Sequence, residues 1–412
     1  MQQNHQSTLL ATGQSTVSRK ALAFIFITVC LDLLGVGILI PVIPFFVGQF
    51  NQDALMVGLL ALSYSAAQFI ASPALGILSD RYGRRSVLLI SVVGTGLGYF
   101  LFGFANALWL LFAARLIDGF TGGNISVAQA YIADVSSPKD RAKNFGLIGA
   151  AFGLGFIIGP ALGGWLSQIS LQTPAFVAGV LSLFTAAFGF FVLPESLPPE
   201  RRQREPIALK ELNPLRQVGD ALRRPALRRL LLANFTQNFA FSGLQTNFAL
   251  FTFVRFGLGP QQNGGIFAYI GLVSGLMQGV ITGLLVKRFN EQQLTVVGLG
   301  LMTLGYAGVA LAPEAWTLYL AITLIAVGGG IAIPTLTSTI SKRVSPRQQG
   351  SILGATQAFS SLALTVGPVW AGVTFDYLGA NAPYWTGAGW LAIAALLAAG
   401  RASSSKRLPS LD

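Results

Sequence analysis

Three charged residues, Asp32, Arg115 and Asp118, lie inside long apolar runs of this chain. A charge at the centre of a bilayer costs roughly 2.5–3.5 kcal/mol to insert, so charges that are kept there usually have a function. Burial favours the neutral form of a carboxyl group, and a nearby arginine favours the ionised form. A carboxyl group that moves between these two environments can take up and release a proton.

Arg115 and Asp118 are three residues apart and therefore share one face of a helix. They can pair with each other and leave Asp32 isolated, or Arg115 can turn towards Asp32. A static ion pair that only helps packing is the alternative, because buried ion pairs are often structural. We predict that Asp32, Arg115 and Asp118 couple the protein to protons.

The composition indicates what surrounds these charges. Apolar residues make up 53% of the chain and charged residues only 10%, whereas a soluble domain carries roughly 25% charge. Runs of about 20 apolar residues can cross a bilayer as helices. We therefore expect an all-α membrane protein with spans near residues 21–44, 54–77, 86–105, 107–134, 144–168, 173–193, 228–251, 263–286, 292–312, 316–340, 351–374 and 382–400.

The positive charges predict an orientation. All of the 27 lysines and arginines except Arg115 and Arg255 fall in the termini, the central loop and alternate short loops. Because cytoplasmic loops carry the excess of positive charge, this pattern places both termini and the central loop in the cytoplasm. The polar start of the chain has no cleavage site, so the first run should remain as a helix. We expect a multi-pass protein of the inner (plasma) membrane.

Several classes of protein are disfavoured. The net charge of +12 is scattered through loops and forms no basic domain with interleaved aromatics, so we expect no nucleic-acid partner. Cys30 is the one cysteine and His5 the one histidine, so neither a disulfide nor a metal site is expected. The chain has no nucleophile elbow and no phosphate loop. We predict a protein that is not an enzyme, needs no cofactor and is monomeric.

The two halves of the chain repeat each other. Ser137-Pro138 recurs as Ser345-Pro346, and Gly159-Pro160 recurs as Gly367-Pro368. Two parallel halves of six helices, with a substrate site between them, form one large class of transporter. The expected organisation is an N-terminal tail (1–20), a first half (21–193), a Pro- and charge-rich central loop (194–227), a second half (228–400) and a C-terminal tail (401–412).

We expect the loop after the second span to act as a conformational latch. An aspartate there can pair with arginines or sit at a helix N-terminus, and glycines permit a tight turn. A basic loop that only sets topology is the alternative. The segment resembles the loop between helices 2 and 3 of major facilitator superfamily transporters. We expect the latch to comprise Gly76, Asp80, Arg81, Gly83, Arg84 and Arg85, together with Asp134.

A second group of motifs narrows the family. The segment from Arg115 to Gly122 resembles the helix-4 motif of the same superfamily. A run of glycines with one proline resembles the helix-5 motif of its drug:proton antiporters, and spaced glycines let helices pack closely. The first span and the block 115–165 resemble the twelve-span tetracycline exporters. The antiporter motif comprises Gly146, Gly155, Gly159, Pro160, Gly163 and Gly164.

One departure from that group concerns the substrate. The resemblance implies further acidic and histidine residues inside helices 3, 8 and 9, but the matching positions here are Gly98, Ser274 and Met302. None of these can ionise. A substrate that is more apolar or less charged than a tetracycline–metal chelate is therefore expected.

The seventh span mixes amides with aromatic residues, which suits an amphipathic ligand. Arg255, Glu195 and Asp376 lie near span ends, where we expect them to anchor at the membrane interface. The candidate substrate-binding residues are Gln68, Gln129, Asn238, Phe241, Gln245, Gln278 and Gln357.

Three functions remain to be compared. The first is export of a small amphipathic drug-like compound in exchange for protons, which the helix-5 motif favours. The second is proton-linked or facilitative uptake of a nutrient, because the fold alone does not exclude it. The third, a membrane enzyme or receptor, has no supporting motif.

Overall fold

The computed structural model describes residues 22–136, 141–202, 219, 222–344 and 349–400. The described residues form helices and turns, without any strand, which confirms the expected all-α fold. The helices group into two compact units, which we describe separately. Unit 1 comprises Met1–Asn51, Ser63–Leu212 and Pro260–Ala268, and unit 2 comprises Gln52–Leu62, Asn213–Gly259 and Tyr269–Asp412.

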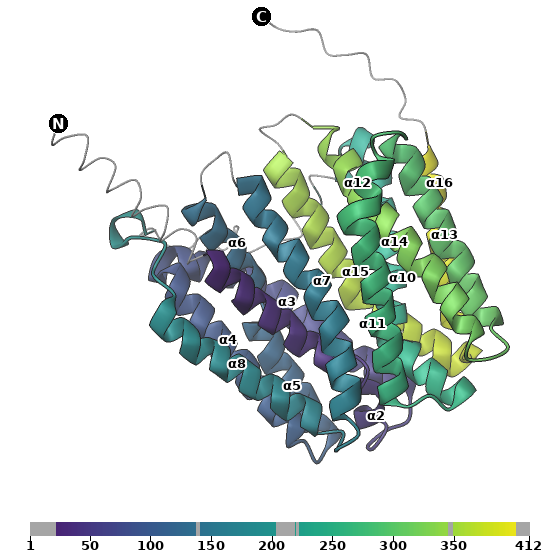
Figure 1. The fold of residues 1–412 in the computed structure, drawn as a ribbon, viewed down its shortest axis with the longest axis horizontal. Coiled ribbons are helices and arrows are strands. Elements are labelled where there is room, and N and C mark those ends of the chain that lie inside the picture. The colour runs from purple at the N-terminus through teal and green to yellow at the C-terminus, as the bar shows by residue number, and fades with distance from the viewer. Residues whose placement is uncertain (1–21, 137–140, 203–218, 220–221, 345–348, 401–412) are drawn as a thin grey trace, which may run out of the picture. The chain divides into compact units, whose positions relative to one another are not determined.

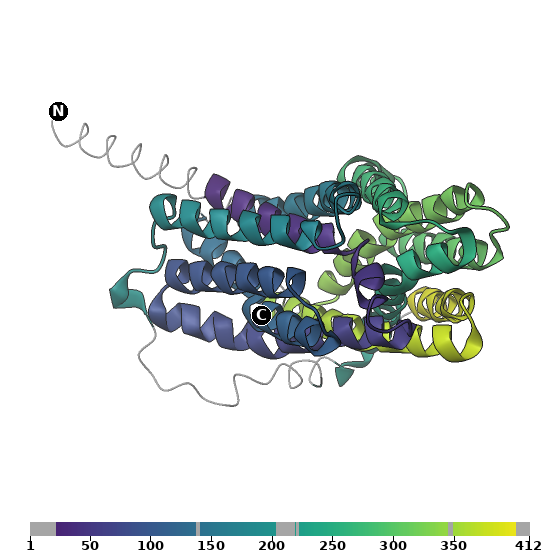
Figure 2. The ribbon, with the colours of Figure 1, turned by 90° about the horizontal axis from the view of Figure 1, so that it is seen from below.

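The first half of the chain begins with the helix Leu22–Leu39. The elements that follow are α2 (Ile43–Val47), α3 (Ala54–Tyr82), α4 (Arg84–Gly103), α5 (Leu108–Thr121), α6 (Asn124–Val135), α7 (Arg141–Leu166), α8 (Thr173–Val192) and the short 3-10 turn η1 (Pro199–Arg201). Within each unit the helices run alongside one another as a bundle (Figures 1 and 2).

The second half contains the corresponding helices. They are α10 (Pro225–Phe256), α11 (Pro260–Leu276), the π-helical turn η3 (Met277–Ile281), α12 (Thr282–Leu285), α13 (Glu291–Leu311), α14 (Thr317–Ser341), α15 (Gln349–Leu378) and α16 (Ala382–Ala399). Proline occupies the first turn of α8, α10, α11 and α16, where its missing N–H costs no helical bond. α10 begins inside the segment 194–227 that we expected to be a loop.

In the described part of the chain, ten helices are long and apolar enough to cross a membrane. α10, which carries many amides, and the α5–α6 pair occupy the positions of the other two expected spans. The span expected at 107–134 is not one continuous helix, because α5 ends at Thr121 and α6 begins at Asn124. The adjacent Gly122 and Gly123 explain the break, since glycine weakens a helix.

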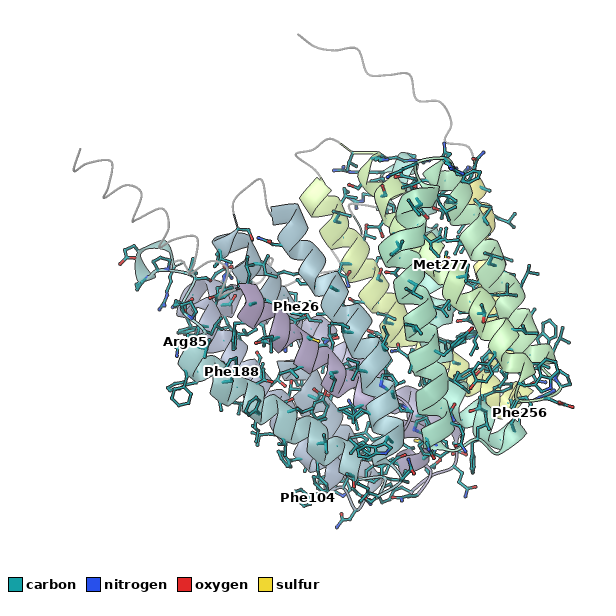
Figure 3. The ribbon with its side chains drawn as sticks, viewed as in Figure 1. Phe26, Arg85, Phe104, Phe188, Phe256 and Met277 are labelled. Atoms are coloured by element: carbon teal, nitrogen blue, oxygen red, sulfur yellow. The ribbon has the colours of Figure 1, made fainter. Side chains whose placement is uncertain are left out.

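The outer surface of each unit is apolar, as expected for helices that face lipid. In unit 1 the exposed side chains include Ile90, Trp109 and Phe191, and in unit 2 they include Leu320 and Leu396. Figure 3 shows Phe104 and Phe188 on the outside of unit 1.

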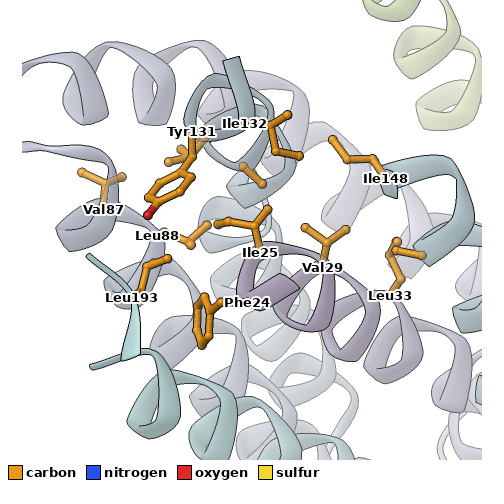
Figure 4. Close-up of a cluster of buried hydrophobic side chains, with 13 residues drawn as sticks. Phe24, Ile25, Val29, Leu33, Val87, Leu88, Tyr131, Ile132, Ile148 and Leu193 are labelled. Atoms are coloured by element: carbon orange, nitrogen blue, oxygen red, sulfur yellow. The ribbon is translucent and has the colours of Figure 1, made fainter. Parts of the chain in front are cut away.

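One end of unit 1 has an apolar core. The first helix contributes Phe24, Ile25 and Val29 to a buried apolar cluster, and α4 contributes Val87 and Leu88 (Figure 4). The cluster also includes Tyr131 and Ile132 from α6. This apolar layer lies between the basic end of unit 1 and the charged residues deeper in the bundle.

Candidate functional site: a buried charge cluster in unit 1

Arg115 and Asp118 form an ion pair in the interior of unit 1. The Arg115 Nη1 atom lies 2.9 Å from Asp118 Oδ2, and the two side chains are only 7% and 3% exposed. The guanidinium carbon also lies 4.7 Å from the centre of the Phe102 ring and 5.7 Å from that of Tyr64. Aromatic faces stabilise a cation that has been removed from water. Of the two arrangements that the sequence left open, the structure has Arg115 paired with Asp118.

Three of the five N–H donors of Arg115 are unused. Its Nε and Nη2 atoms are buried and have no partner among the described residues. A guanidinium group has five N–H donors, and leaving buried donors unpaired is unfavourable. Arg115 can therefore accept a second acceptor group without losing Asp118.

Asp32 lies in the first helix, partly exposed within unit 1. Its partner is not Arg115 but Asn124, whose side chain hydrogen bonds to the carboxylate. Asn124 is buried and is the first residue of α6, immediately after the glycine break. The break thus places a neutral amide, rather than a charge, next to Asp32.

Gln68 was expected to bind substrate, but its amide is engaged inside unit 1. Its Nε2 atom donates to the Tyr64 hydroxyl at 3.1 Å and to the Gly122 carbonyl oxygen at 2.8 Å. Gln68 therefore connects the ring that covers Arg115 to the break between α5 and α6. The Tyr99 hydroxyl, in contrast, is buried without a partner among the described residues.

Gly98 packs directly on Asp118. A Cβ atom at Gly98 would lie 3.1 Å from the Cβ of Asp118 and 3.2 Å from the Ala114 carbonyl oxygen. A carboxylate at position 98 would need both helices to move. At the other two positions of the expected departure, Ser274 donates to the Ala326 carbonyl oxygen at 3.3 Å and Met302 is buried.

The latch residues converge on Arg84 at the basic end of unit 1. Arg84 lies 2.5 Å from Asp80 through Nη2 and 3.1 Å from Asp134 through Nε. Its Nη1 donates to the Ser79 hydroxyl at 2.6 Å. The structure therefore brings together the ends of α3, α4 and α6, and Gly83 makes the turn with φ of 101°.

Two other arginines of the latch motif lie at its edge. Arg81 stacks on the exposed ring of Tyr82. Arg85 donates to the Phe190 carbonyl oxygen and lies over the Phe190 ring, at the outer edge of the unit (Figure 3). Gly76 lies in the last turns of α3 with open space around it.

Glu195 is a member of the latch that we did not predict. It accepts the backbone N–H of Arg84 at 2.9 Å and so caps the N-terminus of α4, the position that we had considered for Asp80. It also pairs with Arg202 at 3.7 Å. A Cβ at Gly83 would collide with its carboxylate. Glu195 is the first acidic residue after Asp140 in the sequence. Its isolation was the one sequence feature that could have marked it as a functional residue.

The glycines of the antiporter motif form a seam between α7 and the first helix. Cβ atoms at Gly155 and Gly159 would lie 2.8 Å from Leu33 and from the Cα of Gly37, respectively. Gly163 packs in the same way on Ile38. Gly146 lies in α7 near its beginning, and Pro160 lies inside the helix. Only glycine permits backbones to approach this closely.

The opposite side of α7 packs on the start of α11, and the contact has a counterpart in unit 2. A Cβ at Gly164 would lie 3.0 Å from the Cα of Gly264. In unit 2, a Cβ at Gly372 would lie 2.7 Å from the Cα of Leu55 at the start of α3. Asp376 caps that start, because it accepts the N–H of Ala54 at 2.9 Å and of Leu55 at 2.8 Å. The sequence repeat is thus also a repeat of contacts.

In unit 2 one group of amides and hydroxyls lies beside aromatic rings. Asn234 donates to the Ser360 hydroxyl at 2.7 Å, and Asn238 donates to the Asn234 carbonyl oxygen at 2.8 Å. The neighbouring Phe239 ring lies 4.9 Å from that of Trp370 and 5.6 Å from that of Trp390. Of the substrate candidates, Asn238 belongs to this group.

The other substrate candidates do not join Asn238 in one cluster. Phe241 and Gln245 follow on the same helix and are half-buried, whereas Gln278, Gln357 and, in unit 1, Gln129 are exposed. In the described part of the chain, His, Cys, Asp and Glu do not gather in groups of three that could hold a metal ion.

The ion pair at the basic end of unit 2 involves a more exposed cation than the pairs at the basic end of unit 1. Lys342 lies 2.8 Å from Glu291, but its side chain is 69% exposed, whereas that of Arg84 is only 10% exposed. Asn290 caps α13 by accepting the N–H of Gln292 at 2.8 Å. Arg255, at the opposite end of α10, donates to Asn381 and to the Ala312 carbonyl oxygen.

The chain resembles known transporters over nearly its whole length. The model of the Major Facilitator Superfamily matches residues 25–368. The class C tetracycline resistance protein of Escherichia coli is 36% identical over 382 residues, which cover 92% of this chain and 95% of that protein. Multidrug resistance protein 2 of Bacillus subtilis is 28% identical over 367 residues, which cover 88% and 90%.

A solved structure agrees with these relatives. The human organic anion transporter MFSD10 (TETRAN) superimposes with a TM-score of 0.71 at 26% sequence identity, covering 92% of this chain and 99% of that one. The chain belongs to the Major Facilitator Superfamily and is a multi-pass membrane transporter of small molecules.

Proposed function

We propose that this protein is a proton-coupled antiporter that exports a small amphipathic, drug-like compound. The observation that carries the proposal is the buried Arg115–Asp118 pair in the same bundle as a second carboxylate, Asp32, which has only a neutral partner. The similarity to tetracycline and multidrug resistance proteins supports export rather than uptake.

The net charge of the cluster couples proton binding to ligand binding. With both carboxylates ionised, the cluster holds two negative charges and one positive charge, so one negative charge is uncompensated. A buried uncompensated charge is unfavourable, and either a proton or a ligand that donates to the carboxylate removes it. Because both compete for Asp32, binding of one promotes release of the other. Such competition exchanges protons for ligand, which is antiport.

The two units would have different roles in transport. Unit 1 supplies the groups that handle the proton, namely Asp32, Arg115 and Asp118. Unit 2 supplies neutral amides and aromatic rings around Asn238, which suit an amphipathic ligand with few charges. Gly98, Ser274 and Met302 bring no further charge, so we favour a multidrug or less charged tetracycline-type substrate over a metal chelate.

The membrane placement is also part of the proposal. The basic ends of the helices face the cytoplasm by the positive-inside rule, with both termini on that side of the inner membrane. Alternating access would proceed by rocking of two six-helix halves, with the latch around Arg84 holding one state. The contacts needed for one bundle are present within a single chain, and we propose a monomer.

The test is substrate-induced proton movement in proteoliposomes that contain a pH-sensitive dye. The panel comprises lipophilic cations, quinolones, tetracyclines and sugars, and Asp32→Asn is compared with wild type. We expect proton release with one class of drug, and its loss in Asp32→Asn. Exchange of labelled for unlabelled substrate, which needs no proton, is measured on the same vesicles and reports whether the variant still binds substrate.

Two outcomes would contradict the proposal. Wild-type proton movement that persists in Asp32→Asn would remove Asp32 from the mechanism. Silence with every drug, together with proton uptake alongside a sugar, would favour the alternative function of nutrient uptake.

A further inference from the structure

Two buried hydroxyl groups of unit 1 lack hydrogen-bond partners. Thr28 is 2% exposed and Ser91 is 1% exposed, and neither hydroxyl contacts a polar atom of the described residues. Serine and threonine in helices usually donate to the carbonyl four residues earlier, as Thr185 does to Leu181 at 2.8 Å. Thr28 and Ser91 do not, although both lie inside helices.

The two hydroxyls lie at similar depth on neighbouring helices. The first helix and α4 pack together at two levels. Phe24 and Leu88 belong to the same apolar cluster near the basic end (Figure 4), and Gly35 lies against the Tyr99 ring further along. Thr28 and Ser91 fall between these two contacts on their respective helices. They are therefore close in depth but not bonded to each other.

Each hydroxyl is one helical turn from the proton-handling cluster. Asp32 follows Thr28 by four residues and Thr95 follows Ser91 by four, so each pair shares a helix face. Thr95 hydrogen bonds to Asp118. The charged groups on this side of the hydroxyls are thus Asp32, Asp118 and the Arg115 guanidinium.

An apolar layer lies on the other side of the hydroxyls. Ile25, Val87 and Leu88 separate them from the latch, where Arg84, Asp80 and Asp134 are the charged groups. A proton that travels between Asp32 and the basic end must cross this layer. Among the described residues, its titratable side chains are the Cys30 thiol, which packs against the layer, and the Tyr131 phenol. Its hydroxyl already donates to the Pro194 carbonyl oxygen at 2.8 Å.

We propose that Thr28 and Ser91 hold a water molecule that carries the proton between Asp32 and the basic end of unit 1. A buried water needs two to four polar partners, and two unpaired hydroxyls with a carboxylate one turn away provide them. The O–H bond of protonated Asp32 breaks as a new O–H bond forms on the water. The water releases a different proton to solvent when the basic end of the unit opens during alternating access. Both hydroxyls keep their own protons.

This inference rests on the proposed proton coupling and assigns its path. The test compares the double variant Thr28→Val/Ser91→Ala with wild type in dye-loaded proteoliposomes. Substrate-induced proton movement should slow at least tenfold, since a positioned proton carrier typically contributes roughly that much or more. Exchange of labelled substrate without a gradient should be unchanged, because no proton crosses during exchange.

Matched controls separate the path from packing. Thr185→Val removes a buried hydroxyl of the same unit that already has a partner on its own helix, and it should leave proton movement unchanged. Thr28→Ser and Ser91→Thr keep the hydroxyls and should retain the wild-type rate even where the double variant folds poorly.

Two results would overturn the inference. One is an unchanged proton rate in the double variant together with a higher melting temperature, which would mean that the hydroxyls were only unpaired polar groups. The other is an equal slowing by Thr185→Val. A wild-type protein that moves no protons with any substrate would instead refute the proposed function itself.

Discussion

The two units repeat one architecture but differ in what they bury. The charged side chains that are buried in the described chain, Arg84, Arg115 and Asp118, all belong to unit 1. The buried polar groups of unit 2 are amides and hydroxyls, such as Asn234, Gln237 and Ser242. At the offset of the repeat, Arg115 and Asp118 correspond to Thr323 and Ala326 in α14.

This difference separates the fold from the function. The described residues of unit 2 pack the same series of helices without a buried charge, so the fold does not require one. Burying an ion pair is costly unless geometry and hydrogen bonds compensate. We therefore attribute the buried charges of unit 1 to transport rather than to folding. The following variants test that conclusion.

The largest effect should come from Arg115→Leu, which leaves Asp118 buried and unpaired. We expect a loss of about 3–5 kcal/mol in the free energy of unfolding and no proton-driven transport. The double variant Arg115→Met/Asp118→Leu removes both charges and makes unit 1 resemble unit 2. It should recover most of the stability, because apolar replacements of buried pairs are often neutral or stabilising.

Unfolding in detergent and proton-driven transport would be measured on the same preparations. The double variant should be stable but inactive. If it transported at the wild-type rate, the pair would be structural and the contrast between the units would have no functional meaning.

The ion pairs at the basic ends of the two units provide the second comparison. Arg84→Ala removes three charge-assisted or polar contacts of a nearly buried side chain and should cost about 2–3 kcal/mol. Lys342→Ala removes one contact of an exposed side chain and should cost less than about 1 kcal/mol. The measurement is the unfolding midpoint of each variant. Equal losses would show that exposure does not determine how much each ion pair contributes to stability.

The sequence was sufficient for the fold but only partly for the site. Apolar runs predicted the helices because membrane insertion depends on local composition. The pairing of Arg115 with Asp118, rather than Asp32, depends on how α3, α4 and α5 pack around it. The same limit applies to Glu195, since a cap supplied from 111 residues away leaves no local pattern.

The glycine seam of unit 1 allows a comparison within one helix. A Cβ at Gly159 would lie 2.8 Å from the Cα of Gly37, whereas a Cβ at Gly153 would meet nothing within 4 Å. We expect Gly159→Ala to cost about 1–3 kcal/mol by overpacking. Gly153→Ala should be neutral or stabilising by up to about 1 kcal/mol, because alanine favours helix. Thermal unfolding and transport would be measured together, and equal behaviour of the two variants would contradict the seam.

The smallest effect should come from Asn238→Ala in unit 2. If unit 2 recognises the ligand through neutral groups, losing this amide should raise the KM for substrate roughly fivefold, the equivalent of one hydrogen bond of about 1 kcal/mol. The number of protons moved per substrate should not change, because the charges of unit 1 remain intact. Gln262→Ala, at an exposed amide of α11, is the control and should leave the KM unchanged. An altered proton count in Asn238→Ala would mean that proton handling extends into unit 2, and the division of work between the units would then be wrong.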